Sequence, residues 1–311
     1  MYTFLVVIAL LFFGVFVPGG AASAHAGEPL SPHDVWSAWN FDPIIWFGIF
    51  LTGFLYARGV RSLWRNAGSG RGVTRGQTAA FAGGLFFLSA ALISPIDAMA
   101  EVLFSAHMVQ HMLLIMGAAP LLVLGIPPAA AAWSIPSVWR VSLGRWWLRQ
   151  NGLRAIWNFL INPWVVWILH GIALVAWHIP RLYEAALLNE FYHALEHFSF
   201  LITAFLFWWV VVRCGKQGGM NHGFGMLYVF SMAMFSGVLG ALITFSRQAW
   251  YPFYALTTQE WGLTLIEDQQ LAGVIMWIPG NFVYLVAFLT LLAQWFKSME
   301  QNETRSKAGS P

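Results

Sequence analysis

Residues 103–126, LFSAHMVQHMLLIMGAAPLLVLGI, form an apolar run that carries two histidines near its start. A helix needs about 20 residues to cross the hydrocarbon core of a bilayer, so this run predicts a transmembrane helix. His107 and His111 are four residues apart, about one helical turn, which places both imidazoles on one face. Such a pair inside a bilayer either joins neighbouring helices by hydrogen bonds or marks a functional site.

The composition outside this run is that of a membrane protein. Of 311 residues, 59% are hydrophobic and only 9% are charged, whereas a soluble domain carries about 25% charged residues. The single cysteine, Cys214, excludes a disulfide framework and a Cys-x-x-Cys motif. Any metal site must therefore use His, Met, Asp or Glu.

Seven apolar segments of spanning length predict an all-α fold, a polytopic membrane helical bundle with seven transmembrane helices. The segments between them are too short to form soluble domains. Residues 27–296 are therefore expected to form one seven-span membrane domain, and residues 297–311 a cytoplasmic tail. The expected spans are 43–58, 77–94, 103–126, 163–180, 193–213, 224–245 and 269–296.

Residues 1–26 have the pattern of a signal peptide. An apolar run from Thr3 to Val17 precedes small residues that fit the A-x-A cleavage pattern. No Lys or Arg stands before the apolar run, so an uncleaved additional span is the alternative.

The basic residues predict the orientation of the bundle. Two basic residues, Arg181 and Arg247, fall on one side of the predicted spans, and the other fourteen of the 16 fall on the opposite side. Basic loops face the cytoplasm, so the N-terminus is expected outside and the C-terminus in the cytoplasm. Arginines alternate with tryptophans in 127–162, which predicts a helix in the headgroup region and disfavours nucleic-acid binding. The fourteen are Arg58, Arg61, Arg65, Arg71, Arg75, Arg140, Arg145, Arg149, Arg154, Arg213, Lys216, Lys297, Arg305 and Lys307.

Given this orientation, five histidines on three helices fall in the outer third of the membrane. Two neutral imidazoles spaced by one turn are typical metal ligands, and two such pairs with a fifth histidine favour a metal or cofactor site over hydrogen bonding alone. His170 lies about 12 Å deeper, where it is either a buried hydrogen-bonding residue or part of a second site. The five are His107, His111, His178, His193 and His197.

Acidic residues are expected at the same end of the bundle. Asp97 and Glu101 precede the third span, Glu196 adjoins His197, and Asp268 opens the seventh span. Carboxylates near a histidine cluster attract cations and orient imidazoles. Asp97 and Asp268 are equally well explained as helix caps.

Methionines supply another class of ligand. Met108, Met112 and Met116 recur every fourth residue of the third span, and Met276 lies at mid-depth in the seventh. Thioether with imidazole suits Cu(I), whereas imidazole alone suits Cu(II) or Zn(II). Methionine is also ordinary packing material, and packing is the favoured interpretation of the triplet.

Two motifs carry a resemblance to a known family. AHMVQH at 106–111, followed by Pro120 and GIP at 125–127, is the first, and DQQLAG at 268–273 with MWIPG at 276–280 is the second. The chain resembles the CtaG family of cytochrome c oxidase assembly factors over residues 40–296.

The resemblance implies a role in maturing a haem-copper cytochrome c oxidase, with copper of unspecified oxidation state as the cargo. Its motif positions here are His107, His111 and Asp268. The implied partners are the oxidase subunits, a periplasmic copper donor and the lipid bilayer. The implied location is a bacterial cytoplasmic (inner) membrane.

Three other functions stay open. Two histidines on facing helices could hold haem b in an electron-transfer protein. This alternative needs histidines at mid-depth, and His170 is such a residue. A metal or proton transporter would need a polar path through the inner half of the bundle, which is mostly apolar. A metal-free scaffold for oxidase subunits is the third. No Walker A run, nucleophile motif or dinucleotide fingerprint occurs, so an enzyme is not expected.

Overall fold

The computed structural model describes residues 30–126, 137–216 and 218–308, and within these it is helical, with no strand. The expected signal peptide lies outside the described residues. A helix occupies each of the seven expected spans: α2 Pro43–Ala67, α3 Arg75–Leu92, α5 Phe104–Met112 continuing through η2 Leu113–Ala118 into α6 Ala119–Gly125, α10 Pro163–His178, α12 Glu190–Val212, α13 His222–Phe245 and α14 Leu265–Ala308.

Shorter helices precede the first of these seven or connect them. They are η1 Val35–Ser37, α4 Pro95–Ala100, α8 Ser137–Arg149, α9 Asn151–Leu160, α11 Pro180–Leu188, η3 Pro252–Leu256 and η4 Thr258–Trp261.

Five helices of the described chain are long and apolar enough to cross a membrane: α2, α5–α6, α12, α13 and α14. A sixth crossing arises if α9 and α10, which meet at a bend of 63°, count as one broken span. The protein is thus a helical membrane protein, while membrane crossing by α3 and by α10 alone stays a prediction.

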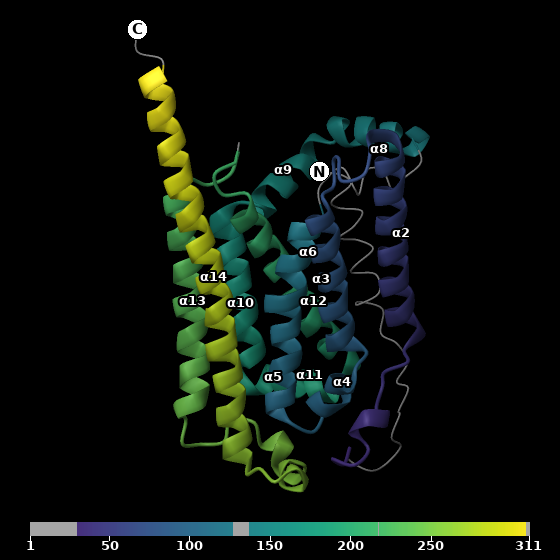
Figure 1. The fold of residues 1–311 in the computed structure, drawn as a ribbon. Helices are drawn as coiled ribbons and strands as arrows, with labels where there is room; N and C mark the ends of the chain where they lie inside the picture. Colours follow the sequence, from purple (N-terminus) through teal and green to yellow (C-terminus); the bar gives the residue numbers. More distant parts are fainter. Residues whose placement is uncertain (1–29, 127–136, 217, 309–311) are drawn as a thin grey trace.

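Helix α12 is the centre of the bundle and the most buried of these spans. It packs against α10 and α11 on one side and against η2 and α6 on the other. Helices α13 and α14 form a long pair on one flank, and α3 joins α2 to the η2–α6 segment on the other (Figure 1).

Small residues allow the α13–α14 pair to approach closely. A Cβ added to Gly273 would lie 2.7 Å from the carbonyl oxygen of Gly240. The two backbones are therefore so close at this point that a side chain at Gly273 would force the helices apart. Close approach at small residues is the usual way in which helices associate inside a bilayer.

The third span is not a uniform α-helix. Residues Leu113–Ala118 form a π-helical segment directly after His111, and Pro120 follows within the next turn. Such a segment and a proline leave carbonyls without their usual helical partners. The indole N–H of Trp208 on α12 donates to the carbonyl of Ile115 at 3.0 Å, which ties the irregular segment to the central helix.

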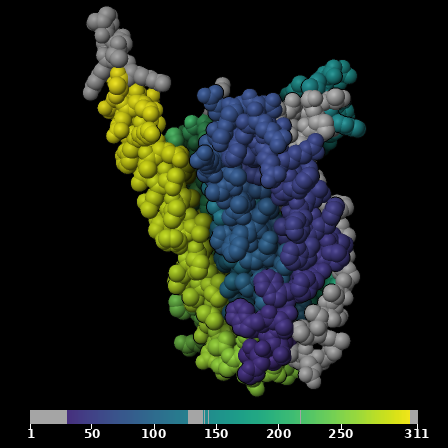
Figure 2. Space-filling model, turned by 45° about the vertical axis from the view of Figure 1, so that its right-hand side comes forward, coloured from purple at the N-terminus to yellow at the C-terminus, as the bar shows by residue number. Residues whose placement is uncertain are grey.

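The two ends of the bundle differ. At the end that we call the histidine end, α5, α12 and α14 begin and α10 ends, and the segment around Leu30 and Ala38 packs beside Val102 and Leu103. At the opposite end, α8 lies across the bundle beside α9 (Figure 1). The last turns of α14 project beyond that end, clear of the other helices (Figure 2).

Candidate metal centre

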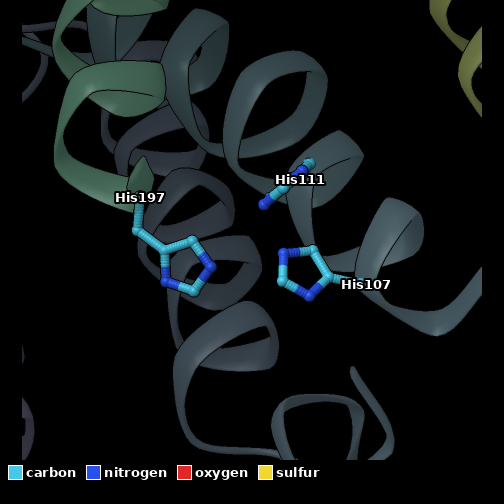
Figure 3. Close-up of side chains that lie close together, drawn as sticks. All are labelled: His107, His111 and His197. Carbon is cyan, nitrogen blue, oxygen red and sulfur yellow. The ribbon is translucent and has the colours of Figure 1, made fainter. Parts of the chain in front are cut away.

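Four imidazoles form a two-step ladder between α5 and α12. Both helices begin at the histidine end, so His107 lies opposite His193 and His111 opposite His197, with ring centroids 5.5 Å and 5.6 Å apart. Along each helix the ring centroids are 4.4 Å apart (His107 and His111) and 4.3 Å apart (His193 and His197). Figure 3 shows the rings of His107, His111 and His197 facing a common space.

The helix arrangement makes room for this ladder. Helix α12 packs closely on η2 and α6 but stands further from α5. The side chains of the ladder fill the space that results; His107, His111 and His197 are buried, and His193 is partly buried.

Glu196 lies within the ladder. Its Oε2 is 3.6 Å from Nε2 of His107, and its Oε1 is 3.5 Å from Nε2 of His111. The carboxylate is fully buried, and neither oxygen has a hydrogen-bond partner. Because a buried charge must be paired or coordinate a metal, this carboxylate requires a cation or a proton.

Nine buried nitrogen and oxygen atoms in this region have no hydrogen-bond partner. In a folded protein such groups are normally satisfied, and exceptions call for a ligand, water or ion. The nine are both ring nitrogens of His107 and of His111, Nε2 of His178, His193 and His197, and both carboxylate oxygens of Glu196.

Two sets of three side chains have the proximity that a metal ion needs. They are His107, His111 and His197, and His107, His193 and Glu196; within each set the ligand atoms lie within 4.8 Å of one another. Neutral imidazole and carboxylate donors fit a first-row transition metal such as copper or zinc. The residues present therefore fit a metal ion.

Three tyrosines cover the His107 side of the ladder; we call Tyr183, Tyr251 and Tyr254 the tyrosine cap. The Tyr183 hydroxyl lies 2.7 Å from that of Tyr254, which donates to the carbonyl of Ala100. The Tyr183 ring lies 5.0 Å from that of His107. Burial raises the pKa of Tyr183 and Tyr254 well above the usual value, so both hydroxyls stay protonated.

The two histidines of α10 lie outside both ligand sets. Nδ1 of His178 donates to the carbonyl of Leu174 at 2.6 Å, so its bare Nε2 is the nitrogen with a free lone pair. Phe200 lies between it and the ladder, 6.3 Å from His178 and 4.7 Å from His111. The deeper His170 bonds through Nδ1 to the Thr203 hydroxyl at 2.9 Å, as expected of a buried hydrogen-bonding residue.

Asp268 acts on the ladder through the backbone. Its two oxygens accept from the N–H groups of Phe104 at 2.7 Å and of Ser105 at 3.1 Å. It therefore caps the N-terminus of α5, the helix that carries His107, rather than its own helix. Its own helix is capped by Thr264, the residue before it, together with Glu267 in its first turn.

Asp97 lies on α4, away from the ladder. It accepts hydrogen bonds from Asn40 at 2.7 Å and from the buried Gln110 at 2.6 Å. Burial raises the pKa of its carboxyl from 3.8 to about 6. Its contacts join α4 and α5 to the segment before α2.

The methionines lie in packing positions. Met108 and Met276 are part of the large hydrophobic core. Met112 and Met116 face Gly280 of α14, where an added Cβ would lie 3.7 Å from the Met112 sulfur. Packing was the interpretation favoured for the triplet, and these positions agree with it.

Glu196 and the tyrosine cap were not among the predicted ligands. Glu196 follows His193 by three residues, a helical spacing that puts it on the same face, so the His-x-x-Glu pattern was the available signal. The cap comes from α11, from η3 and from Tyr251 directly before η3, short segments that have no periodic pattern to read.

Fold and site together define a helical membrane protein with a buried cluster of metal-ligating side chains at one end of its bundle. The family model of the cytochrome c oxidase caa3 assembly factors matches residues 54–298. The chain belongs to this family, which confirms the resemblance that the two motifs carry.

The relatives found among curated proteins are mycobacterial. Uncharacterised proteins of Mycobacterium bovis and Mycobacterium tuberculosis are each 26% identical over 276 residues, which cover 86% of this chain and 41% of the relative. The chain thus spans about two fifths of the length of these relatives. No solved structure matches the chain.

Proposed function

We propose that this protein binds copper at the histidine ladder and Glu196, and that it helps to load the copper centre of a haem-copper cytochrome c oxidase. The observation that carries the proposal is the set of buried imidazole and carboxylate atoms without protein partners. Membership of the oxidase assembly family supports the oxidase as the destination of the metal.

Copper is the ion that the donor set favours. The donor set contains imidazole and carboxylate groups but no thiolate, so it is not a sulfur site of the kind typical of structural zinc. Among first-row divalent ions, copper binds imidazole and carboxylate donors most tightly. The Asp268 cap and the Glu196 carboxylate hold the ladder, so the residues bind and position the cargo rather than catalyse a reaction.

The proposed orientation puts the histidine end outside the cytoplasm, in a bacterial inner membrane. Fourteen basic residues on the other side support this. A periplasmic copper donor could then reach the ladder from the nearer surface, and oxidase subunits would receive the metal within the membrane.

Two of the alternatives fit the packing less well. The ladder rings contact Phe200 and Tyr183 as well as one another, which leaves no slot between them for a porphyrin. On the inner side of the ladder the described core is largely aromatic and aliphatic, with Phe205, Phe207 and Trp208 buried, which disfavours an ion path through the bundle.

The test is oxidase maturation in cells grown at low copper. Cells that lack this protein, or that carry His107→Ala with His111→Ala, are expected to contain oxidase subunits and haem but little oxidase copper and activity. Added copper should restore part of the activity, because mass action drives an inefficient loading step. The matched control, His222→Ala, changes a histidine at the start of α13 at the opposite end and should behave as wild type. Normal copper content and activity without the protein would refute the proposal.

A further inference from the structure

We propose that the ladder binds two metal ions rather than one, with Glu196 as a carboxylate bridge between them. One ion lies at the His107–His193 step and the other at the His111–His197 step. The inference rests on the proposed function for the identity of the metal only; the number of ions follows from the side chains.

The ligand sets follow the same two steps, with His107 as the residue that they share, and Glu196 reaches the second step through its 3.5 Å approach to His111. His193 and Glu196 form one set with His107, and His111 and His197 form the other with His107. Since the two sets share one residue, each step of the ladder has its own ligands. His107 lies at the junction between them.

The number of free donors exceeds what one ion can use. Each neutral imidazole has one lone pair, so the four ladder histidines and the two oxygens of Glu196 offer six donor atoms in the cluster. A tetrahedral ion takes about four. A single ion would leave buried donors unsatisfied, which is costly, whereas two ions that share Glu196 engage all six.

The geometry of Glu196 is that of a bridge. Two ligands bound at about 2.0–2.1 Å to one tetrahedral ion lie roughly 3.3 Å apart, close to the 3.6 Å and 3.5 Å between the Glu196 oxygens and the two imidazoles. Each oxygen approaches a different histidine, so each belongs to a different ion. Paired metal ions commonly lie about 3.5–4 Å apart, and the two steps of the ladder, with ring centroids 4.4 Å and 4.3 Å apart along each helix, are spaced on a comparable scale.

The local sequence has a precedent in helical bundles. Two-metal carboxylate sites in bundles use a glutamate and a histidine three residues apart on one helix. His193 and Glu196 have the same three-residue spacing on α12, with the histidine first instead of the glutamate, and α5 supplies the facing pair of histidines.

The experiment measures bound copper in the full chain, purified in detergent and dialysed against Cu(II). We expect two tightly held ions per wild-type chain, and a half-field electron paramagnetic resonance signal from their magnetic coupling. His193→Ala and His197→Ala should each retain one ion and lose that signal. His33→Ala, an exposed histidine, controls for surface binding and should keep two coupled ions.

Several results would overturn the inference. One ion per wild-type chain, or loss of all copper in both single variants, means one shared site. Thermal unfolding of each copper-free variant checks that it is folded, and Glu196→Gln provides a further variant of nearly unchanged volume, in which the coupling signal should disappear. Failure of the proposed function is a different result, because two coupled ions could be bound while oxidase copper stays normal without the protein.

Discussion

At the scale of single residues, Glu196 has opposite effects on two properties: it lowers the stability of the copper-free fold and favours the proposed metal binding. A buried carboxylate without a hydrogen-bond partner destabilises the copper-free fold, yet it is the only acid in either ligand set. Binding of the proposed metal ion would therefore relieve a free-energy cost that the buried carboxylate imposes on folding.

Glu196→Gln is expected to separate these two effects. The amide has nearly the same shape without the charge, so the copper-free protein should unfold at the same or a higher temperature. Copper affinity, measured by competition with a soluble chelator, should fall by about tenfold or more. A variant that is less stable and binds copper normally would contradict this account.

Asp268→Asn tests the cap on α5. Asparagine can accept only through its single oxygen, so one of the two backbone bonds and the charge at the helix N-terminus are lost. We expect a loss of about 1–2 kcal/mol in the stability of the copper-free protein, read from thermal unfolding, with weaker copper binding as a consequence. The control is Glu267→Gln, one residue away but exposed, which should change stability less.

The pH dependence of stability should reveal Asp97. Its folded-state pKa, about 6, exceeds the ordinary 3.8 because the carboxyl is buried. The folded chain thus binds this proton more tightly than the unfolded chain, and its contribution is fully present below about pH 4 and lost as the pH rises through 6. The stability of wild type relative to Asp97→Asn should therefore increase from pH 6.5 to pH 4. A flat difference across that range would show that Asp97 does not titrate there.

At the scale of helices, the π-helical segment depends on one indole. Trp208→Phe keeps the aromatic contact with Tyr284 but leaves the Ile115 carbonyl without its donor. The expected cost is about 1–3 kcal/mol in thermal unfolding. Trp295→Phe, a half-exposed tryptophan on α14, should cost much less. Equal losses in the two variants would mean that the hydrogen bond is unimportant.

Hydropathy alone predicted where the long helices lie, because apolar runs of spanning length leave few other structures in a bilayer. It could not predict the π-helical segment, which depends on a donor from α12, or the length of α14, whose polar last turns carry no apolar signal. The paired histidines were found because four-residue spacing is local. The helix that Asp268 caps could not be predicted, because its backbone partners on α5 are more than 160 residues away.

At the scale of the whole molecule, the distribution of arginines predicts which segments face the cytoplasm. Reporters fused after Gly70, Arg149 and the end of α14 should all read cytoplasmic. A reporter after Glu101, between α4 and α5, should read external. The signal at that position shows whether α3 crosses the membrane. A cytoplasmic signal there would mean that α3 does not cross and that the histidine end does not face the outside.

The tyrosine cap has a kinetic consequence. Its hydroxyls bind one another and the backbone at Ala100 and His178, so an ion bound at the ladder as proposed would have to open these bonds to leave on this side. The residence time of such an ion would then depend on how often the cap opens as well as on how strongly the imidazoles hold the ion. The closed cap would shield the ion from free solutes, and a partner that displaces α11 would speed its release.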